Sequence, residues 1–405
     1  MSKVEELLAK YNSNGVKKII LSSIGDFENI GVDKKTVEGE PLVTLLNYVD
    51  VYHNKTIKKG VPQMTVSSPI NKVDKCSVEQ GDIFITPTSE TVDDIGHSAL
   101  VLETLPQTVY SYHIMRYRLH NVSMTTASYI NQCFESCYVK QQILKKAQGL
   151  TRFGVSKSKF GEIEIPLPHI KVQEEIVKIL DSFTNLIDAL SEELSLRQKQ
   201  FEYYREKLLT FDDKSLLKPI NEIGTLFRGN GLQKKDFVEE GVGCIHYGQI
   251  YTKLGFSLSK PLTYVTKETA KPLTKVRKGD LVIACTSENI EDVCKSVVWE
   301  GEEEIVTGGH ACVLRHNENP RYIGYFFQTH QFFMQKKQYA YGAKVIDIKT
   351  EKLGEILIPV PSLAIQLSIV EKLDAFESLI SSLKEEIALR QKQYEYYREK
   401  LLTFD

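Results

Sequence analysis

The sequence contains no run of eighteen apolar residues, which argues against a membrane-spanning helix. Its first residues, Met1-Ser-Lys-Val-Glu-Glu, lack the basic-then-apolar order of a signal peptide, so a cytoplasmic protein is expected. The seven cysteines include no CxxC pair, which argues against a zinc ribbon or a redox motif. With 42% hydrophobic and 26% charged residues, the 405-residue chain is globular and long enough for two domains.

Catalytic signatures are also missing. The chain has no GxxxxGK[ST] phosphate loop, no Asn/Asp-Pro-Pro-aromatic motif of amino-methyltransferases and no proline followed by aspartate, as common nuclease sites require. The nine histidines show no metal-ligand spacing. His113 and His310 each lie in an apolar run, and we interpret both as packed, hydrogen-bonded side chains. The sequence therefore predicts no catalytic site, no metal and no cofactor in this chain.

Strong charge of either sign is absent, because the formal net charge is −2. The average hides a difference along the chain, since the segments at 163–212 and 356–405 are acidic and the rest carries a small positive excess. That excess is too small to predict a phosphate-binding face by itself.

What the sequence does contain is a long internal repeat. Residues 197–212 (RQKQFEYYREKLLTFD) recur at 390–405 with one change, Phe201 to Tyr394. A repeat of this length indicates two copies of a whole module. Weaker matches precede both copies: 46–52 with 245–251, 81–90 with 279–288, 112–118 with 309–315, and Gln148-Gly149 with Tyr341-Gly342.

The repeated segments have a 4-3-4-3 apolar spacing, which predicts coiled-coil helices of about 33 residues, about 50 Å long. Arg197 and Arg390 interrupt both seams at the same place. Each arginine either extends its charge to the helix edge or fixes the pairing register. The predicted seam positions are Ile176, Leu180, Phe183, Ile187, Leu190, Leu194, Arg197, Phe201, Tyr204 and Leu208, then Ile369, Leu373, Phe376, Ile380, Leu383, Ile387, Arg390, Tyr394, Tyr397 and Leu401.

The chain thus reads as domain, coil, domain, coil, with boundaries at 1–162, 163–212, 213–355 and 356–405. Mixed strand patterns and single helices predicted over 128–147 and 323–338 make each domain α+β. Residues 6–11 resemble 207–212, so the N-terminal residues are expected to pack near the end of the second coil. Because the coils are nearly identical and the domains have diverged, the coils should share one task and the domains perform different ones.

This organisation resembles the specificity subunit of type I restriction–modification systems. The resemblance covers the whole chain and rests on the duplicated order, on IEIPLP…QEEIV at 163–177 and ILIPVP…QLSIV at 356–370, and on the Gly-Asp-strand-Thr-Ser elements. It implies two target-recognition domains in pseudo-twofold arrangement, each reading half of a bipartite, asymmetric site in double-stranded DNA. It also implies an antiparallel coiled coil that sets the spacing and recruits two methyltransferase subunits, which restriction subunits can join. S-adenosylmethionine, ATP and magnesium would belong to those partners, and this chain would not be an enzyme.

Side chains that can hold phosphates and reach base edges occur at paired positions of the two domains. The candidates are Lys34, Lys35, Tyr52, Thr88, Ser89 and Arg152, then Arg228, Lys234, Lys235, Tyr251, Thr286, Ser287 and Lys344. Two alternatives remain from the residues alone: a scaffold of two protein-binding domains on a coil that binds no DNA, and an enzyme assembled from dispersed residues.

Overall fold

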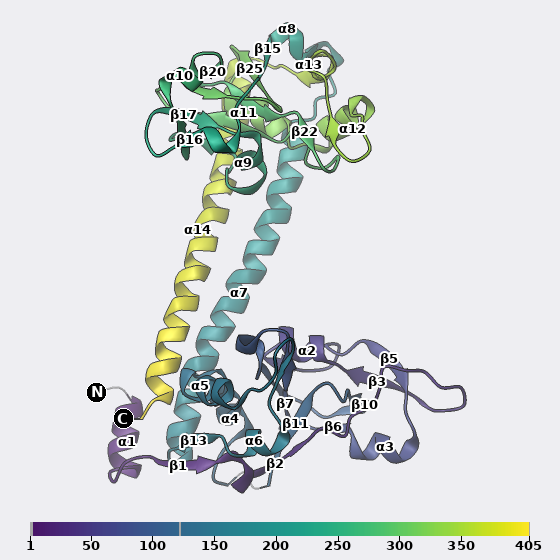
Figure 1. The fold of residues 1–405 in the computed structure, drawn as a ribbon, viewed down its shortest axis with the longest axis vertical. Coiled ribbons are helices and arrows are strands. Elements are labelled where there is room, and N and C mark those ends of the chain that lie inside the picture. Colours follow the sequence, from purple (N-terminus) through teal and green to yellow (C-terminus); the bar gives the residue numbers. More distant parts are fainter. Residues whose placement is uncertain (1–2, 121–122, 405) are drawn as a thin grey trace. The chain divides into compact units, whose positions relative to one another are not determined.

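The computed structural model describes residues 3–120 and 123–404 (Figure 1). The chain forms two compact units, Met1–Leu190 with Glu386–Asp405, and Ser191–Glu385. Each unit contains one globular domain and one end of each of two long helices, α7 (Ile170–Leu208) and α14 (Leu363–Leu402). Within the described residues, no helix is long and apolar enough to cross a membrane.

Unit 1 is built on a five-stranded and a four-stranded sheet. The strand order of the five-stranded sheet is β2 (Gly25–Glu28), β11 (Met115–Leu119), β7 (Ile83–Ile85), β9 (Ser98–Val101) and β4 (Thr56–Ile57). The strand order of the four-stranded sheet is β5 (Met64–Ser67), β3 (Leu42–Leu46), β10 (Leu105–Tyr110) and β6 (Ser77–Val78). Two small sheets pair β1 (Lys17–Ile20) with β13 (Glu164–Leu167), and β8 (Thr88–Ser89) with β12 (Phe153–Gly154). The helices are α1 (Lys3–Tyr11), α2 (Tyr48–His53), α3 (Ile70–Lys75), α4 (Ala127–Glu135), α5 (Cys137–Lys146) and α6 (Lys157–Gly161).

Unit 2 repeats this plan, except that its second sheet has five strands instead of four. The strand order of its first sheet is β15 (Gly224–Arg228), β25 (Ala311–His316), β21 (Leu281–Ala284), β23 (Ser296–Trp299) and β18 (Ser257–Leu258). The strand order of its second sheet is β16 (Phe237–Val238), β19 (Thr263–Val265), β17 (Val242–Ile245), β24 (Ile305–Thr307) and β20 (Thr274–Val276). The small pairs are β14 (Leu217–Pro219) with β27 (Leu357–Pro359), and β22 (Thr286–Ser287) with β26 (Ile346–Asp347). The helices are α8 (Ile220–Ile223), α9 (Tyr247–Thr252), α10 (Lys267–Ala270), α11 (Pro320–Phe326), α12 (His330–Tyr339) and α13 (Thr350–Gly354).

A repeated ion pair braces the first sheet of each unit, the one that contains β11 in unit 1 and β25 in unit 2. Arg118 on β11 contacts the carboxylate of Asp82 at 2.5 Å, and Arg315 on β25 contacts that of Asp280 at 2.7 Å. Both aspartates are buried, so each carboxylate needs the arginine to offset the cost of leaving water. The sequence match between 112–118 and 309–315 therefore marks one structural feature present twice.

The long helices begin later than the segments 163–212 and 356–405 predict. Residues 164–167 and 357–359 form strands β13 and β27 instead, each paired with the first strand of its domain. The helices start after Pro168 and Pro361, because the residue before a proline avoids the helical region. Gln173 and Gln366 secure these starts, since each donates a side-chain hydrogen bond to the carbonyl of Pro168 (2.8 Å) or Pro361 (2.9 Å).

Two further predicted helices are each divided in two. Residues 128–147 contain α4 and α5, which meet at Ser136, and 323–338 contain parts of α11 and α12, which are separated before Thr329. Ser136 and Thr329 have extended backbone conformations and accept hydrogen bonds from the amides of Val139 and Phe332. The single-helix predictions are wrong because these hydroxyls cap a second helix, which the apolar pattern alone does not show.

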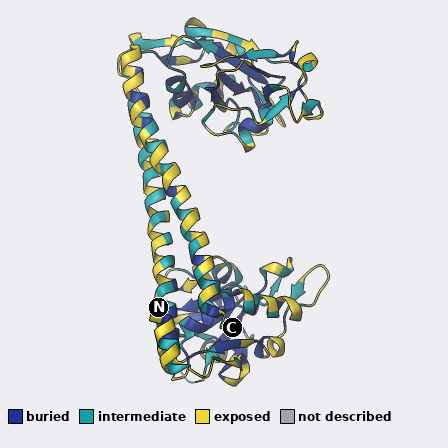
Figure 2. Cartoon of the chain, turned by 90° about the vertical axis from the view of Figure 1, so that its left-hand side faces the viewer, coloured by how far each residue is buried: buried dark blue, intermediate teal, exposed yellow. Residues whose placement is uncertain are grey.

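The helix ends pack antiparallel inside each unit. In unit 1 the ring of Phe183 stacks on that of Tyr397 with centroids 5.4 Å apart, and in unit 2 Phe376 stacks on Tyr204 at 5.5 Å. All twenty predicted seam residues are buried or half-buried, whereas the opposite faces of α7 and α14 are exposed (Figure 2). The predicted α+β architecture with two similar domains and antiparallel coiled-coil helices is confirmed.

The two seam arginines bond within their own helices. Arg197 contacts Glu193 and Gln200, and Arg390 contacts Glu386 with an Nε–Oε1 distance of 2.7 Å. Such i, i+4 contacts at the helix edge fit the interpretation that the charge reaches outward, not the one in which it fixes the pairing register.

The N-terminal helix packs where the sequence predicts. Val4 of α1 lies in the same apolar cluster as Leu402 of α14, and Tyr11 stacks on His169 with ring centroids 4.3 Å apart. Both contacts lie inside unit 1, where α1 covers the end of the second helix (Figure 1).

Candidate nucleic-acid interface

Unit 1 contains a concavity of about 490 Å³ beside the N-terminal end of α2. Strand β3 leads into α2 through Asn47, whose side chain caps the helix and fixes its start. Tyr48 and Tyr52 follow on one face of α2, with ring centroids 5.9 Å apart. Both line the concavity, which thus has an aromatic wall.

Five of the six residues predicted in the first domain meet at this concavity: Lys34, Tyr52, Thr88, Ser89 and Arg152. A guanidinium nitrogen of Arg152 donates to the hydroxyl of Thr88 at 3.3 Å. Lys35 does not line the concavity, and its ammonium group contacts Asp33 at 3.1 Å. The acidic Glu90 and Asp94 also line the concavity, so its charge is mixed and not simply basic.

His113 lines the same concavity, although the sequence suggests a packed, hydrogen-bonded side chain. It is half-buried, and His310 is exposed, so neither histidine is a core residue. Burial, together with the positive charges of Lys34 and Arg152, lowers the pKa of His113 below its ordinary value. The neighbouring Ile114 and Met115 are buried, so the apolar run does enter the core, but His113 lies outside it.

Unit 2 brings together corresponding residues at the N-terminal end of α9. His246 caps that helix, and Tyr247 and Tyr251 follow it with ring centroids 6.4 Å apart. The ring of His310 lies 5.0 Å from that of Tyr247, on a backbone with φ +67. A positive φ in a residue other than glycine costs about 1–3 kcal/mol, and such strain is concentrated at functional sites.

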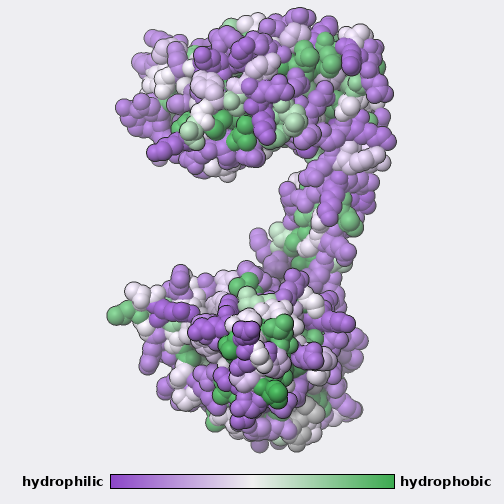
Figure 3. Space-filling model, turned by 90° about the vertical axis from the view of Figure 1, so that its right-hand side faces the viewer, coloured by the Kyte–Doolittle hydropathy of each residue, from purple (hydrophilic) through white to green (hydrophobic). Residues whose placement is uncertain are grey.

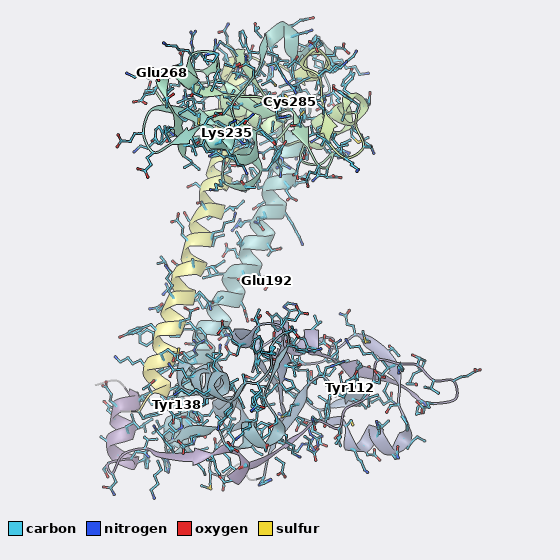
Figure 4. All side chains as sticks on the ribbon, viewed as in Figure 1. Tyr112, Tyr138, Glu192, Lys235, Glu268 and Cys285 are labelled. Atoms are coloured by element: carbon cyan, nitrogen blue, oxygen red, sulfur yellow. The ribbon has the colours of Figure 1, made fainter. Side chains whose placement is uncertain are left out.

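The predicted residues of the second domain divide into exposed and structural ones. Lys234, Lys235 (labelled in Figure 4) and Lys344 are exposed, and Ser287 is half-buried on β22. Thr286 is buried, and its carbonyl accepts a hydrogen bond of 2.6 Å from the hydroxyl of Tyr251.

Arg228 also has a structural role. It donates hydrogen bonds to Asp347 and to the carbonyl of Ile348, both at 3.2 Å, and so supports strand β26. Arg228, Tyr251 and Thr286 therefore shape the surface in addition to any contact they make with a ligand.

The two surfaces share one set of residue types at matching positions. Each has a lysine pair before the first strand of the second sheet (β3 or β16), two tyrosines on a short helix, a Thr-Ser strand, and a histidine before β11 or β25. The residues chosen from the sequence omit the first tyrosine (Tyr48 or Tyr247) and the histidine (His113 or His310) of each surface. All four lie within segments that match between the domains. The cluster is Lys34, Tyr48, Tyr52, Thr88, Ser89 and His113 in unit 1, and Lys234, Tyr247, Tyr251, Thr286, Ser287 and His310 in unit 2.

Such a surface has the groups that bind nucleic acid. Lysines contact phosphates, hydroxyls and imidazoles donate to phosphate or base oxygens, and tyrosines contact sugars and bases. No group of three or more His, Cys, Asp or Glu side chains suited to a metal ion occurs in the described parts of the chain.

The fold resembles those of known restriction–modification subunits. The S subunit of a type I system from M. genitalium superposes with a TM-score of 0.55 at 15% identity, covering 96% of both chains. A chain from a structure of type I system assembly and conformational transition gives 0.58, also at 15% identity and 96% coverage. At this identity the likeness establishes the fold alone.

The sequence establishes the family. Residues 18–196 and 217–389 each match the type I restriction modification DNA specificity domain, so the chain belongs to this family and carries two such domains. A putative specificity subunit from Haemophilus influenzae is 31% identical over 272 residues, 63% of this chain and 68% of the relative. The EcoR124I/EcoR124II specificity subunit of Escherichia coli is 31% identical over 264 residues, 61% of this chain and 65% of the relative. The matched segment thus spans about two thirds of these curated relatives.

Proposed function

We propose that this specificity subunit binds double-stranded DNA through both domains, each reading one half of a bipartite, asymmetric site. The observation that carries the proposal is the duplicated lysine–tyrosine–hydroxyl–histidine cluster at the surface of two otherwise divergent domains. The same chemistry at both sites supports one class of ligand, and the divergent surroundings support two different sequences.

Duplex binding is tested by measuring the affinity of the full chain for DNA as salt concentration rises. Affinity should fall steeply, with a logarithmic slope of about −0.9 for each phosphate contacted. Replacing both Lys34 and Lys234 by glutamine should reduce that slope, because two phosphate contacts are removed. Salt-independent binding, or none, would favour the protein scaffold instead.

The helices carry repeated apolar residues that the seam does not use. Leu196 and Tyr203 on α7 are 59% exposed, and their counterparts Leu389 and Tyr396 on α14 are 62% and 61% exposed. Members of each pair are seven residues apart and therefore lie on one helix face. Apolar side chains occur among hydrophilic ones along the helices (Figure 3).

These two equal surfaces support binding of two methyltransferase subunits, with restriction subunits joining through them. In this proposal the chain has no catalytic activity, and S-adenosylmethionine, ATP and magnesium are held by the partners. One pair lies in unit 2 and the other in unit 1, so each unit would hold one methyltransferase.

Partner number can be measured by sizing the reconstituted complex. Leu389→Asp should leave one methyltransferase bound, and Leu196→Asp combined with Leu389→Asp should leave none. Glu192→Asp, on α7 like Leu196, is the control, because this change keeps the charge of the helix and its apolar surface (Figure 4). Two bound copies in the double variant would reject these surfaces as the docking sites.

A further inference from the structure

One surface loop has the same backbone in both domains but presents different side chains. In unit 1, Gln148 and Gly154 exchange two backbone hydrogen bonds of 2.8 and 2.9 Å and close the loop between them. In unit 2, Tyr341 and Asp347 close a loop of the same length with bonds of 2.8 and 3.0 Å. We call these the 149–153 loop and the 342–346 loop.

Both loops require glycine at the first position. Gly149 and Gly342 have φ of +139 and +118, and a Cβ atom there would lie 2.0 Å from the carbonyl oxygen of Arg152 or 1.9 Å from that of Val345. No larger residue fits without moving the loop. The two loops therefore have the same conformation for the same reason.

Both loops are attached to the shared cluster in the same register. Phe153 pairs with Ser89 and Gly154 with Thr88, just as Ile346 pairs with Ser287 and Asp347 with Thr286. The Thr-Ser strand is thus flanked by a loop whose backbone is constant between the domains.

The side chains on this constant backbone differ. The unit 1 loop reads Gly-Leu-Thr-Arg-Phe and the unit 2 loop reads Gly-Ala-Lys-Val-Ile. Each has one cation, but at successive positions: Arg152 is fourth in its loop and Lys344 is third in its own. Both cations are exposed, and Leu150 at the tip of the first loop is 94% exposed.

We infer that the two parts of each surface have separate tasks, an inference that rests on the proposed DNA binding. Lys34 and Lys234, in the clusters common to both domains, contact the phosphate backbone, which is the same for every DNA sequence. Arg152 and Lys344, on the loops that differ, contact base edges and determine which half-site each domain reads.

The chemistry of these groups fits the division. An arginine or lysine donating to O6 and N7 of guanine is the commonest specific contact in the major groove, so each loop should select guanine at one position. The cluster lysines are single positive charges, which neutralise phosphate without distinguishing bases. Because the loop cations stand at different positions, the selected guanines should occupy different places in the two half-sites.

The test uses the full chain and a duplex library randomised across the half-sites, with the selected sequences read out for each variant. Arg152→Gln should lose guanine preference at one position of one half-site, by about 5- to 150-fold in discrimination, and leave the other half unchanged. Lys344→Gln should do the same in the other half. Both residues are exposed, so the variants should fold.

Lys34→Gln should weaken binding equally for all sequences and reduce the logarithmic salt slope by about 1. Lys35→Gln is the matched control. Lys35 has the same charge as Lys34 and follows it in the sequence, but it lies outside the concavity and forms an ion pair with Asp33. Its salt slope should change less than that of Lys34→Gln.

The outcomes separate the inference from the function beneath it. If the unaltered chain shows no salt-dependent duplex binding, the proposed function fails. If it binds but Arg152→Gln weakens every sequence equally, or Lys34→Gln alters the selected bases, the division of tasks is wrong while DNA binding stands.

Discussion

The hydroxyl of Tyr394 donates a hydrogen bond of 3.1 Å to the side-chain oxygen of Gln132, inside unit 1. Lys55 lies over the same ring, with its ammonium nitrogen 4.5 Å from the centroid. In unit 2 the equivalent helix residue is Phe201, whose ring faces that of Tyr325 at 6.2 Å. The single difference between the two copies of the repeat is thus a residue that contacts a globular domain: Tyr394 contacts the domain of unit 1, and Phe201 contacts that of unit 2.

Tyr394→Phe should therefore lower the free energy of unfolding by about 1–3 kcal/mol, since the hydroxyl loses two hydrogen bonds while the ring remains. One is donated to Gln132, and the other is accepted from the ammonium group of Lys55 at 3.4 Å. A double-mutant cycle with Gln132→Ala, followed by urea unfolding, isolates this pair from the contact between Gln132 and Asp181. Effects that simply add would show that the pair contributes nothing.

Replacement of His310 should reveal its strained backbone. At φ +67, glycine is favoured over alanine, so His310→Gly should be more stable than His310→Ala by about 1 kcal/mol. The same two replacements at His53, the last residue of α2, serve as a control and should rank in the opposite order. Equal stability of the two His310 variants would show that no strain is present.

DNA affinity should depend on pH through His113. Its pKa is lowered in the free protein, and a phosphate placed nearby would raise it, so binding takes up protons. Affinity should be greatest below the pKa of the free protein and decline as pH rises through the pKa of the DNA complex. Dissociation constants measured across this range should show a shallower decline for His113→Gln. An unchanged decline would mean that other groups titrate on binding.

The coil should act as the ruler between half-sites. Adding one heptad to both α7 and α14 keeps the seam and lengthens each helix by about 10 Å. The gap in the modified site should grow by at most about 3 base pairs. Adding the heptad to one helix alone should mispair the seam and mainly destabilise the protein. An unchanged gap in a stable, active complex with both insertions would show that the coil sets no spacing.

The repeat makes much of the architecture predictable from the amino-acid sequence. The 4-3-4-3 apolar spacing in both copies indicates the long helices. The matched Gly-Asp-strand-Thr-Ser segments indicate the strands at 83–85 and 281–283. Local hydrogen bonds are harder to foresee, because the caps at Ser136 and Thr329 each divide a helix that the apolar pattern alone would make continuous.

The candidate sites are only partly predictable for a related reason. Residue types identify Lys34 and Arg152, but not that Lys35 contacts Asp33 instead of the concavity. The apolar run around His113 suggests that its side chain is buried. That inference is misleading because the sequence does not show which way a side chain faces at a turn. The equal backbones of the two loops emerge only from the hydrogen bonds that close them.

The most direct measurement is to map methylated adenines in DNA treated with the complex reconstituted from this chain and its partner methyltransferase. We predict one asymmetric site in two parts with a fixed gap. Replacing residues 1–162 by the first domain of another family member should change one part and leave the other intact. A single continuous or symmetric site, or an exchange that alters both parts, would contradict independent reading by two domains.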